Sequence, residues 1–189
     1  MEELEELKRR LEEERPMVWD SFPDIGLYMD QVISYVSRQL ISYDGGEALT
    51  PAMVNNYIKD GLLPRADGKK YSKTHLGYLT AICALKQVLS VRDTRTLLEI
   101  GSAGRDPEKL YAAFYQELSL ALDCTAEVLD PDLSQEDLPR LALRLALRSY
   151  WPASVSSPSL PPRRRSRSAG KSDFHSEYIL HFIREVITI

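Results

Sequence analysis

Two adjacent asparagines, Asn55 and Asn56, carry the most readable binding chemistry in this sequence. A carboxamide has an acceptor oxygen and two N–H donors, so asparagine can bind the N6 and N7 atoms of adenine bidentately in a major groove. Short helices that enter a groove present such side chains near their N-terminal half. Plain solvation of the pair is the alternative interpretation, and the residues alone leave both open.

Long cationic side chains surround the asparagine pair, at spacings that could reach phosphates on either side of a bound duplex. Residues 50–95 contain eight Lys or Arg against three Asp, a net charge of +5, whereas the whole chain carries −4. A basic segment inside an acidic chain indicates a surface for a polyanion. The candidate phosphate contacts are Lys59, Arg65, Lys69, Lys70 and Lys73.

A short helix is predicted to position the asparagines. Thr50 is a good N-cap, and Pro51 suits the first helical position because its missing N–H would have no partner there. Gly61 is expected just past the C-terminus, and Pro64 prevents continuation. Thr50 and Tyr57 complete the candidate DNA-contacting set, although the spacing of Tyr57 also fits a core residue.

A small wing is predicted to follow, from Arg65 to Tyr71, because Asp67-Gly68 is a dipeptide typical of tight hairpin turns. Ser72 and Ser90 are expected to cap the two helices after it. Further helices are predicted over residues 2–15, 26–42, from Asp106 onward and 138–150, which makes the fold class all-α: a winged helix-turn-helix followed by additional helices and a disordered basic linker.

Five segments follow from these patterns. They are an N-terminal charged helix (1–22), the winged domain (23–104), a helical accessory region (105–151), a disordered basic linker (152–172) and a C-terminal amphipathic helix (173–189). The linker is Pro/Ser-rich and contains the run Arg163–Arg167 without acidic residues.

Several classes of protein are disfavoured. The three histidines and two cysteines form no metal-ligand or triad spacing, and no glycine-rich phosphate loop is present, so we predict no metal, no cofactor and no enzyme. No apolar run approaches the roughly 20 residues of a membrane span. The charged start, residues 2–15, does not resemble a secretory signal. We therefore expect a cytoplasmic protein that does not bind membranes.

A resemblance supports the DNA-binding interpretation. The stretch from Val54 to Pro64 resembles the recognition-helix end of MerR-type regulators, and Lys69-Lys70-Tyr71-Ser72 is similar to the end of their wing. Residues 89–98 are similar to the segment that follows. The longer stretch from Pro23 to Leu98 resembles a bacterial family of a domain of unknown function, usually described as MerR-like. Where MerR proteins carry Arg and Tyr, this chain has Asn55 and Asn56, so their base-reading rule does not transfer.

The resemblance and the charge pattern predict a bacterial DNA-binding protein, a transcriptional regulator whose partner is double-stranded DNA. A protein-interaction module that keeps the winged shape without binding DNA is the alternative, favoured by the overall acidity. A homodimer is one expected assembly, because a single recognition helix covers few base pairs. Its contact could use the Leu4-Leu7-Leu11 stripe, the helix from Asp106 or the C-terminal segment, and the effector is left open.

Overall fold

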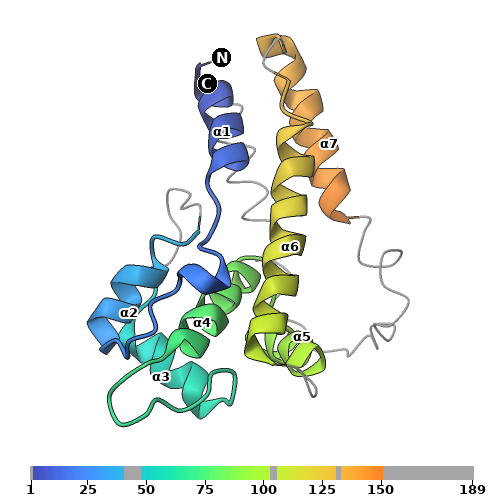
Figure 1. Ribbon diagram of the computed structural model, residues 1–189. Helices are drawn as coiled ribbons and strands as arrows, with labels where there is room; N and C mark the ends of the chain where they lie inside the picture. The colour runs from blue at the N-terminus through green and yellow to red at the C-terminus, as the bar shows by residue number, and fades with distance from the viewer. Residues whose placement is uncertain (1, 41–47, 103–105, 131–132, 151–189) are drawn as a thin grey trace, which may run out of the picture. The chain divides into compact units, whose positions relative to one another are not determined.

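The structure is a computed structural model that describes residues 2–40, 48–102, 106–130 and 133–150. The described residues form seven α-helices and two short 3-10 helices, with no β-strand beyond isolated bridges, which confirms the all-α class (Figure 1). The α-helices are α1 (Glu2–Glu13), α2 (Met29–Val36), α3 (Pro51–Lys59), α4 (Lys73–Lys86), α5 (Val91–Ser102), α6 (Pro107–Ala126) and α7 (Leu138–Tyr150).

The chain divides into two compact units. The larger, Lys8–Ala126, contains helices α2 to α6, and α4 lies at its centre, in contact with α2, α5 and α6. The middle of α4 is almost wholly buried because its apolar residues surround the helix instead of forming one stripe. Leu76, Leu79 and Ile82 are fully buried there. Helix α3 packs on α2, which in turn packs on α4.

Helix α6 packs on α4 and on the 3-10 helix Trp19–Ser21 within the larger unit, and it contributes Tyr111 to an aromatic cluster with Trp19 and Phe22. Tyr111 on α6 lies 4.9 Å from Phe22 and 5.9 Å from Trp19, between ring centroids, and its hydroxyl donates to the Met17 carbonyl at 2.7 Å. Gly77 on α4 allows this approach, since a Cβ there would lie 2.9 Å from the Trp19 ring. Helices α2, α3, α4 and α6 thus share one hydrophobic core.

Two helix boundaries differ from the sequence prediction. The helix expected over 26–42 is α2, Met29–Val36, because the backbone of Leu27 is hydrogen-bonded to Tyr71 instead of to a helical neighbour. A turn follows α2 at Ser37, where helical hydrogen bonding ends. Helix α5 continues through Gly101 to Ser102. The predicted caps at Thr50, Ser72 and Ser90 stand at the starts of α3, α4 and α5.

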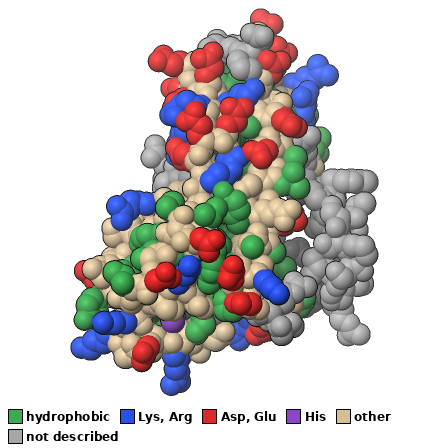
Figure 2. Space-filling model, viewed as in Figure 1, with side chains coloured by type: hydrophobic (Ala, Val, Ile, Leu, Met, Phe, Trp, Pro, Cys, Tyr) green, Lys and Arg blue, Asp and Glu red, His purple; other side chains and the backbone are tan. Residues whose placement is uncertain are grey.

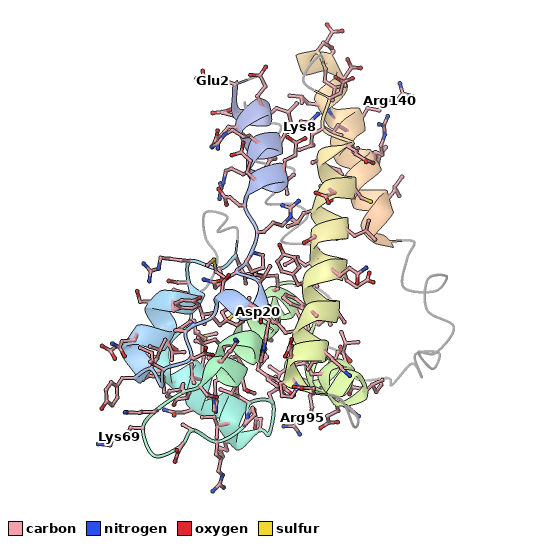
Figure 3. All side chains as sticks on the ribbon, viewed as in Figure 1. Glu2, Lys8, Asp20, Lys69, Arg95 and Arg140 are labelled. Atoms are coloured by element: carbon pink, nitrogen blue, oxygen red, sulfur yellow. The ribbon has the colours of Figure 1, made fainter. Side chains whose placement is uncertain are left out.

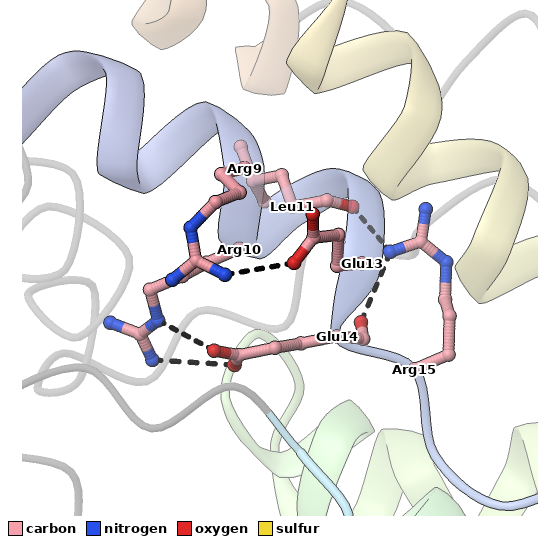
Figure 4. Close-up of polar contacts among 6 residues, drawn as sticks. All are labelled: Arg9, Arg10, Leu11, Glu13, Glu14 and Arg15. Carbon is pink, nitrogen blue, oxygen red and sulfur yellow. Dashed lines mark hydrogen bonds and ion pairs between the residues drawn. The ribbon is translucent and has the colours of Figure 1, made fainter.

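The end of α1 is held by its own charged side chains (Figure 4). Arg9 pairs with Glu13 at 2.8 Å and Arg10 with Glu14 at 2.9 Å, each one helical turn apart. Arg15 then donates to the carbonyls of Leu11 and Glu14 and pairs with Asp123 of α6. These contacts lie inside the larger unit and satisfy carbonyls that the helix end leaves without partners.

The smaller unit contains residues 1–7 and 127–189. The structure describes residues 2–7, 127–130 and 133–150 of it. Ser134 and Asp137 form a capping pair: the Ser134 hydroxyl donates to the Asp137 carboxylate at 2.7 Å. Helix α7 follows and buries Leu138, Leu141 and Ala142. The predicted linker (152–172) and C-terminal helix (173–189) lie outside the described residues. None of the described helices is long and apolar enough to cross a membrane.

Candidate nucleic-acid interface

Helix α3 is defined at both ends by local chemistry. The Thr50 side chain accepts the Met53 N–H at 3.2 Å, and Pro51 follows at the first helical position. At the other end Gly61 takes φ +73°, its N–H donates to Ile58, and the Leu62 N–H donates to the Tyr57 carbonyl at 2.8 Å. That paired hydrogen bonding is a Schellman motif, which ends a helix abruptly. Nine residues remain, about 13 Å of helix.

The two sides of α3 differ in burial. Val54 is fully buried and Tyr57 is 4% exposed, so both side chains lie in the core. The opposite side forms the α3 outer face, which is exposed and consists of Ala52, Asn55, Asn56 and Lys59. The helix thus brings both asparagines and one cation to a single surface. It places Tyr57 in the core, away from that surface, and Thr50 at the cap.

The wing, residues 65–71, is a two-residue hairpin. Asp67 and Lys70 exchange backbone hydrogen bonds of 3.1 and 2.9 Å, and Gly68 takes φ +60° at the turn. Beside it, Leu27 and Tyr71 exchange hydrogen bonds of 2.9 and 2.8 Å, which fasten the wing to the segment before α2. The loop between α3 and α4 projects from the helices in Figure 1. Lys69 stands at its tip (Figure 3).

His75 holds both ends of the wing. Its Nδ1 accepts the Ser72 N–H at 3.0 Å, so Nδ1 carries no proton there, and Nε2 donates to the Arg65 carbonyl at 3.2 Å. Its ring also contacts Tyr71 edge-on, with 5.4 Å between centroids. Burial raises the pKa of Tyr71. His75 was not among the predicted site residues. Its position three residues after the capping serine Ser72 could have indicated a capping role.

Lys70 is oriented by the segment beside the wing. Its aliphatic stem covers Gly26, where an added Cβ would lie 3.0 Å from the Lys70 Cβ, and its ammonium lies 6.0 Å from the Tyr28 ring centroid. Tyr28 remains 51% exposed next to this cation, and Ile25, the residue before Gly26, is 68% exposed. Sequence reasoning missed these two, because nothing in their spacing reveals that residues 25–28 pair with the wing.

The candidate cations divide into two groups. Lys59, Arg65, Lys69 and Lys70 are exposed. Lys73 differs, because it pairs with Asp24 at 3.4 Å and its ammonium lies 5.5 Å from the Trp19 ring centroid. In Figure 2, Lys and Arg side chains gather at the lower left of the view, around α2, α3 and the wing. Asp60 and Asp67 are also exposed there, so the surface is basic but not uniformly so.

The connection between α2 and α3 is longer than the turn of a standard helix-turn-helix. Residues 37–50 connect α2 to α3, a longer connection than the three or four residues usual in DNA-binding helix-turn-helix units. Among the described residues no group of His, Cys, Asp or Glu is arranged to hold a metal ion. Cys83, on α4, is partly buried, and this desolvation raises its pKa to about 12.

The fold and this surface define a small helical domain with an exposed polar helix followed by a basic hairpin. The chain belongs to the family described as a domain of unknown function, DUF1836, whose profile matches residues 17–118. That match extends from the segment before the first 3-10 helix into α6, so it includes every candidate contact residue. No curated protein and no solved structure matches this chain.

Proposed function

We propose that this protein binds double-stranded DNA as a transcriptional regulator of the bacterial cytoplasm, through a MerR-like winged helix-turn-helix. The observation that carries the proposal is that one compact unit exposes two elements with complementary chemistry. The α3 outer face offers Asn55 and Asn56, which can bind base edges, and the hairpin that follows α3 in the chain offers Lys69 and Lys70, which can bind phosphates.

Dimensions and rigidity support the same function. An α-helix fits the major groove of B-form DNA, and α3 is anchored through buried Val54 and Tyr57 while its polar side stays open. The wing is fixed by four backbone hydrogen bonds and by His75, so its cations have a defined position relative to α4. A preformed surface loses little conformational entropy when it binds.

The experiment is selection of DNA fragments from a genomic library by the full chain, followed by binding measurements at several salt concentrations. We expect an enriched sequence and an affinity that falls as salt rises, because each neutralised phosphate releases counterions. Changing Lys69→Ala with Lys70→Ala should weaken binding to all sequences and lower the salt slope by about 1 per lost contact.

The matched control is Lys109→Ala, which removes an exposed lysine from α6, outside the proposed interface. Its salt slope should equal that of the unaltered chain. An unchanged slope in the Lys69/Lys70 variant would remove the wing from the interface. Absence of any enriched or salt-dependent DNA binding would overturn the proposed function.

A second function is favoured by the exposed apolar side chains of Ile25 and of Tyr28, which lies next to Lys70. A surface of this kind suits a protein partner, because aromatic residues contribute strongly to interface cores. The winged shape would then serve protein recognition without DNA. Changing Tyr28→Ala should abolish capture of that partner, whereas the Lys69→Ala with Lys70→Ala change should affect it less.

A further inference from the structure

Among the described residues, helix α7 has exposed apolar side chains on the side opposite its buried face. At 3.6 residues per turn, the buried residues Leu138, Leu141 and Ala142 lie on one side of the helix. Leu143 and Leu147, one turn apart on the opposite side, are 59% and 56% exposed. Two large aliphatic side chains on an outer helix face form a stripe of the kind that receives another amphipathic helix.

The stripe is also basic. Arg140 and Arg144 lie beside the two leucines on the same side and are exposed, and α7 contains no acidic residue. The α7 outer face is defined here as Arg140, Leu143, Arg144 and Leu147. Its chemistry therefore fits an acidic partner that carries apolar side chains at helical spacing.

Residues 173–189 have this composition. They contain three acidic residues, Asp173, Glu177 and Glu185, against one cation, Arg184. Their apolar residues recur at intervals of three and four, the spacing of an amphipathic helix. Those residues are Phe174, Tyr178, Ile179, Leu180, Phe182, Ile183, Val186, Ile187 and Ile189.

Chain length permits the contact. Residues 151–172, 22 in number, connect α7 to this segment and can span at most roughly 75 Å. From its middle to its end α7 measures only about 10 Å, so the segment can return to the helix it follows. Covalent connection raises the effective concentration of such a partner to about the millimolar range.

We propose that residues 173–189 dock onto the α7 outer face of the same chain. Their apolar side chains cover Leu143 and Leu147, and their carboxylates face Arg140 and Arg144. The contact is independent of DNA binding. It makes the C-terminal segment a built-in cover for a face that would otherwise expose apolar surface.

The test is chymotrypsin cleavage of the full chain after Phe174, Tyr178 and Phe182, with the products assigned by mass spectrometry. Cleavage tracks the fraction of undocked segment. The variant Leu143→Gln with Leu147→Gln should therefore be cut at these sites about tenfold faster than the unaltered chain. Both leucines are exposed, so the change leaves the buried side of α7 intact.

Matched controls keep the result interpretable. Leu97→Gln with Ile100→Gln removes an exposed apolar pair from α5 and should leave the cleavage rate unchanged. Phe182→Gln should accelerate cleavage after Phe174 without altering α7. Arg140→Glu with Arg144→Glu should also accelerate it, and Glu177→Lys with Glu185→Lys should partly reverse that effect. Equal cleavage rates in the Leu143/Leu147 variant and the unaltered chain would overturn the proposal.

Dilution separates the intended contact from exchange between copies. Protection that persists on tenfold dilution supports docking within one chain. Protection that is lost on dilution would assign the face to a second copy and overturn the intramolecular arrangement.

Discussion

The α3 outer face and the wing lie on the same domain but offer different chemistry by different means. Helix α3 presents uncharged carboxamides and is held by side chains buried in the core, Val54 and Tyr57. The wing presents cations and is held mainly by backbone hydrogen bonds to Leu27 and across its own turn. Base recognition requires accurate placement, whereas a phosphate contact tolerates more freedom because charge attraction varies slowly with distance.

The largest expected effect separates the two sides of α3. Changing Tyr57→Ala should lower the free energy of unfolding by about 3 kcal/mol, because a large buried ring is replaced by a cavity. Asn56→Ala on the exposed side should change it by less than about 0.5 kcal/mol. Urea denaturation of both variants measures the difference. Similar destabilisation by the two changes would mean that α3 packs differently.

The next effect separates base reading from phosphate binding. Asn55→Ala should cost on the order of 1–3 kcal/mol on the preferred DNA sequence and little on unrelated DNA, provided that the contact is bidentate. Lys69→Ala should weaken binding to both DNAs alike. Titrations of each variant against the selected and a scrambled duplex compare them. Equal loss on every DNA after Asn55→Ala would remove the base-reading role.

Two glycines sharpen the comparison between helix end and hairpin. Gly61 and Gly68 both have positive φ and open space around the position of a Cβ, so alanine would meet backbone strain alone. Each change should cost about 1–2 kcal/mol. Gly61→Ala should lower the stability of the whole domain, since it shifts Leu62 and Leu63 in the core. Gly68→Ala should instead distort the turn of the wing and reduce DNA affinity. DNA titration and urea denaturation of both variants distinguish the two effects.

The smallest expected effect concerns the pH dependence of the wing anchor. Burial raises the pKa of Tyr71 above its ordinary value of about 10, so the neutral phenol is favoured in the folded state. The resulting stability is complete below that ordinary value and is lost as pH rises through the raised pKa. Tyr71→Phe should therefore lose less stability than the unaltered chain between about pH 9 and 11. Identical alkaline curves would contradict this role.

Local signals predicted the candidate site well where backbone chemistry is local. Thr50, Pro51 and Gly61 fixed the bounds of α3 because capping and positive φ involve only a few neighbouring residues. Asp67-Gly68 predicted the hairpin for the same reason. The exposure of Asn55 and Asn56 followed from helical spacing once those bounds were known.

Other features of the site depend on partners distant in sequence. Lys73 was predicted to reach phosphate, yet its ammonium lies near Asp24 and Trp19, roughly fifty residues earlier. The early helix was expected to begin near Gly26, but Leu27 pairs with Tyr71. No local pattern encodes such contacts, because they exist only after the chain has folded back on itself.

By itself, the sequence determined the all-α class, the short capped helix, the turn of the wing and the family, since each depends on residue type and near-neighbour spacing. The tertiary structure decided that Tyr57 is buried, that His75 holds the wing and that Ile25 and Tyr28 are exposed, with Tyr28 beside Lys70. The sequence left these outcomes open because burial depends on which surfaces pack together around α4. Those surfaces, and the hydrogen bonds between them, come from residues far apart in the chain.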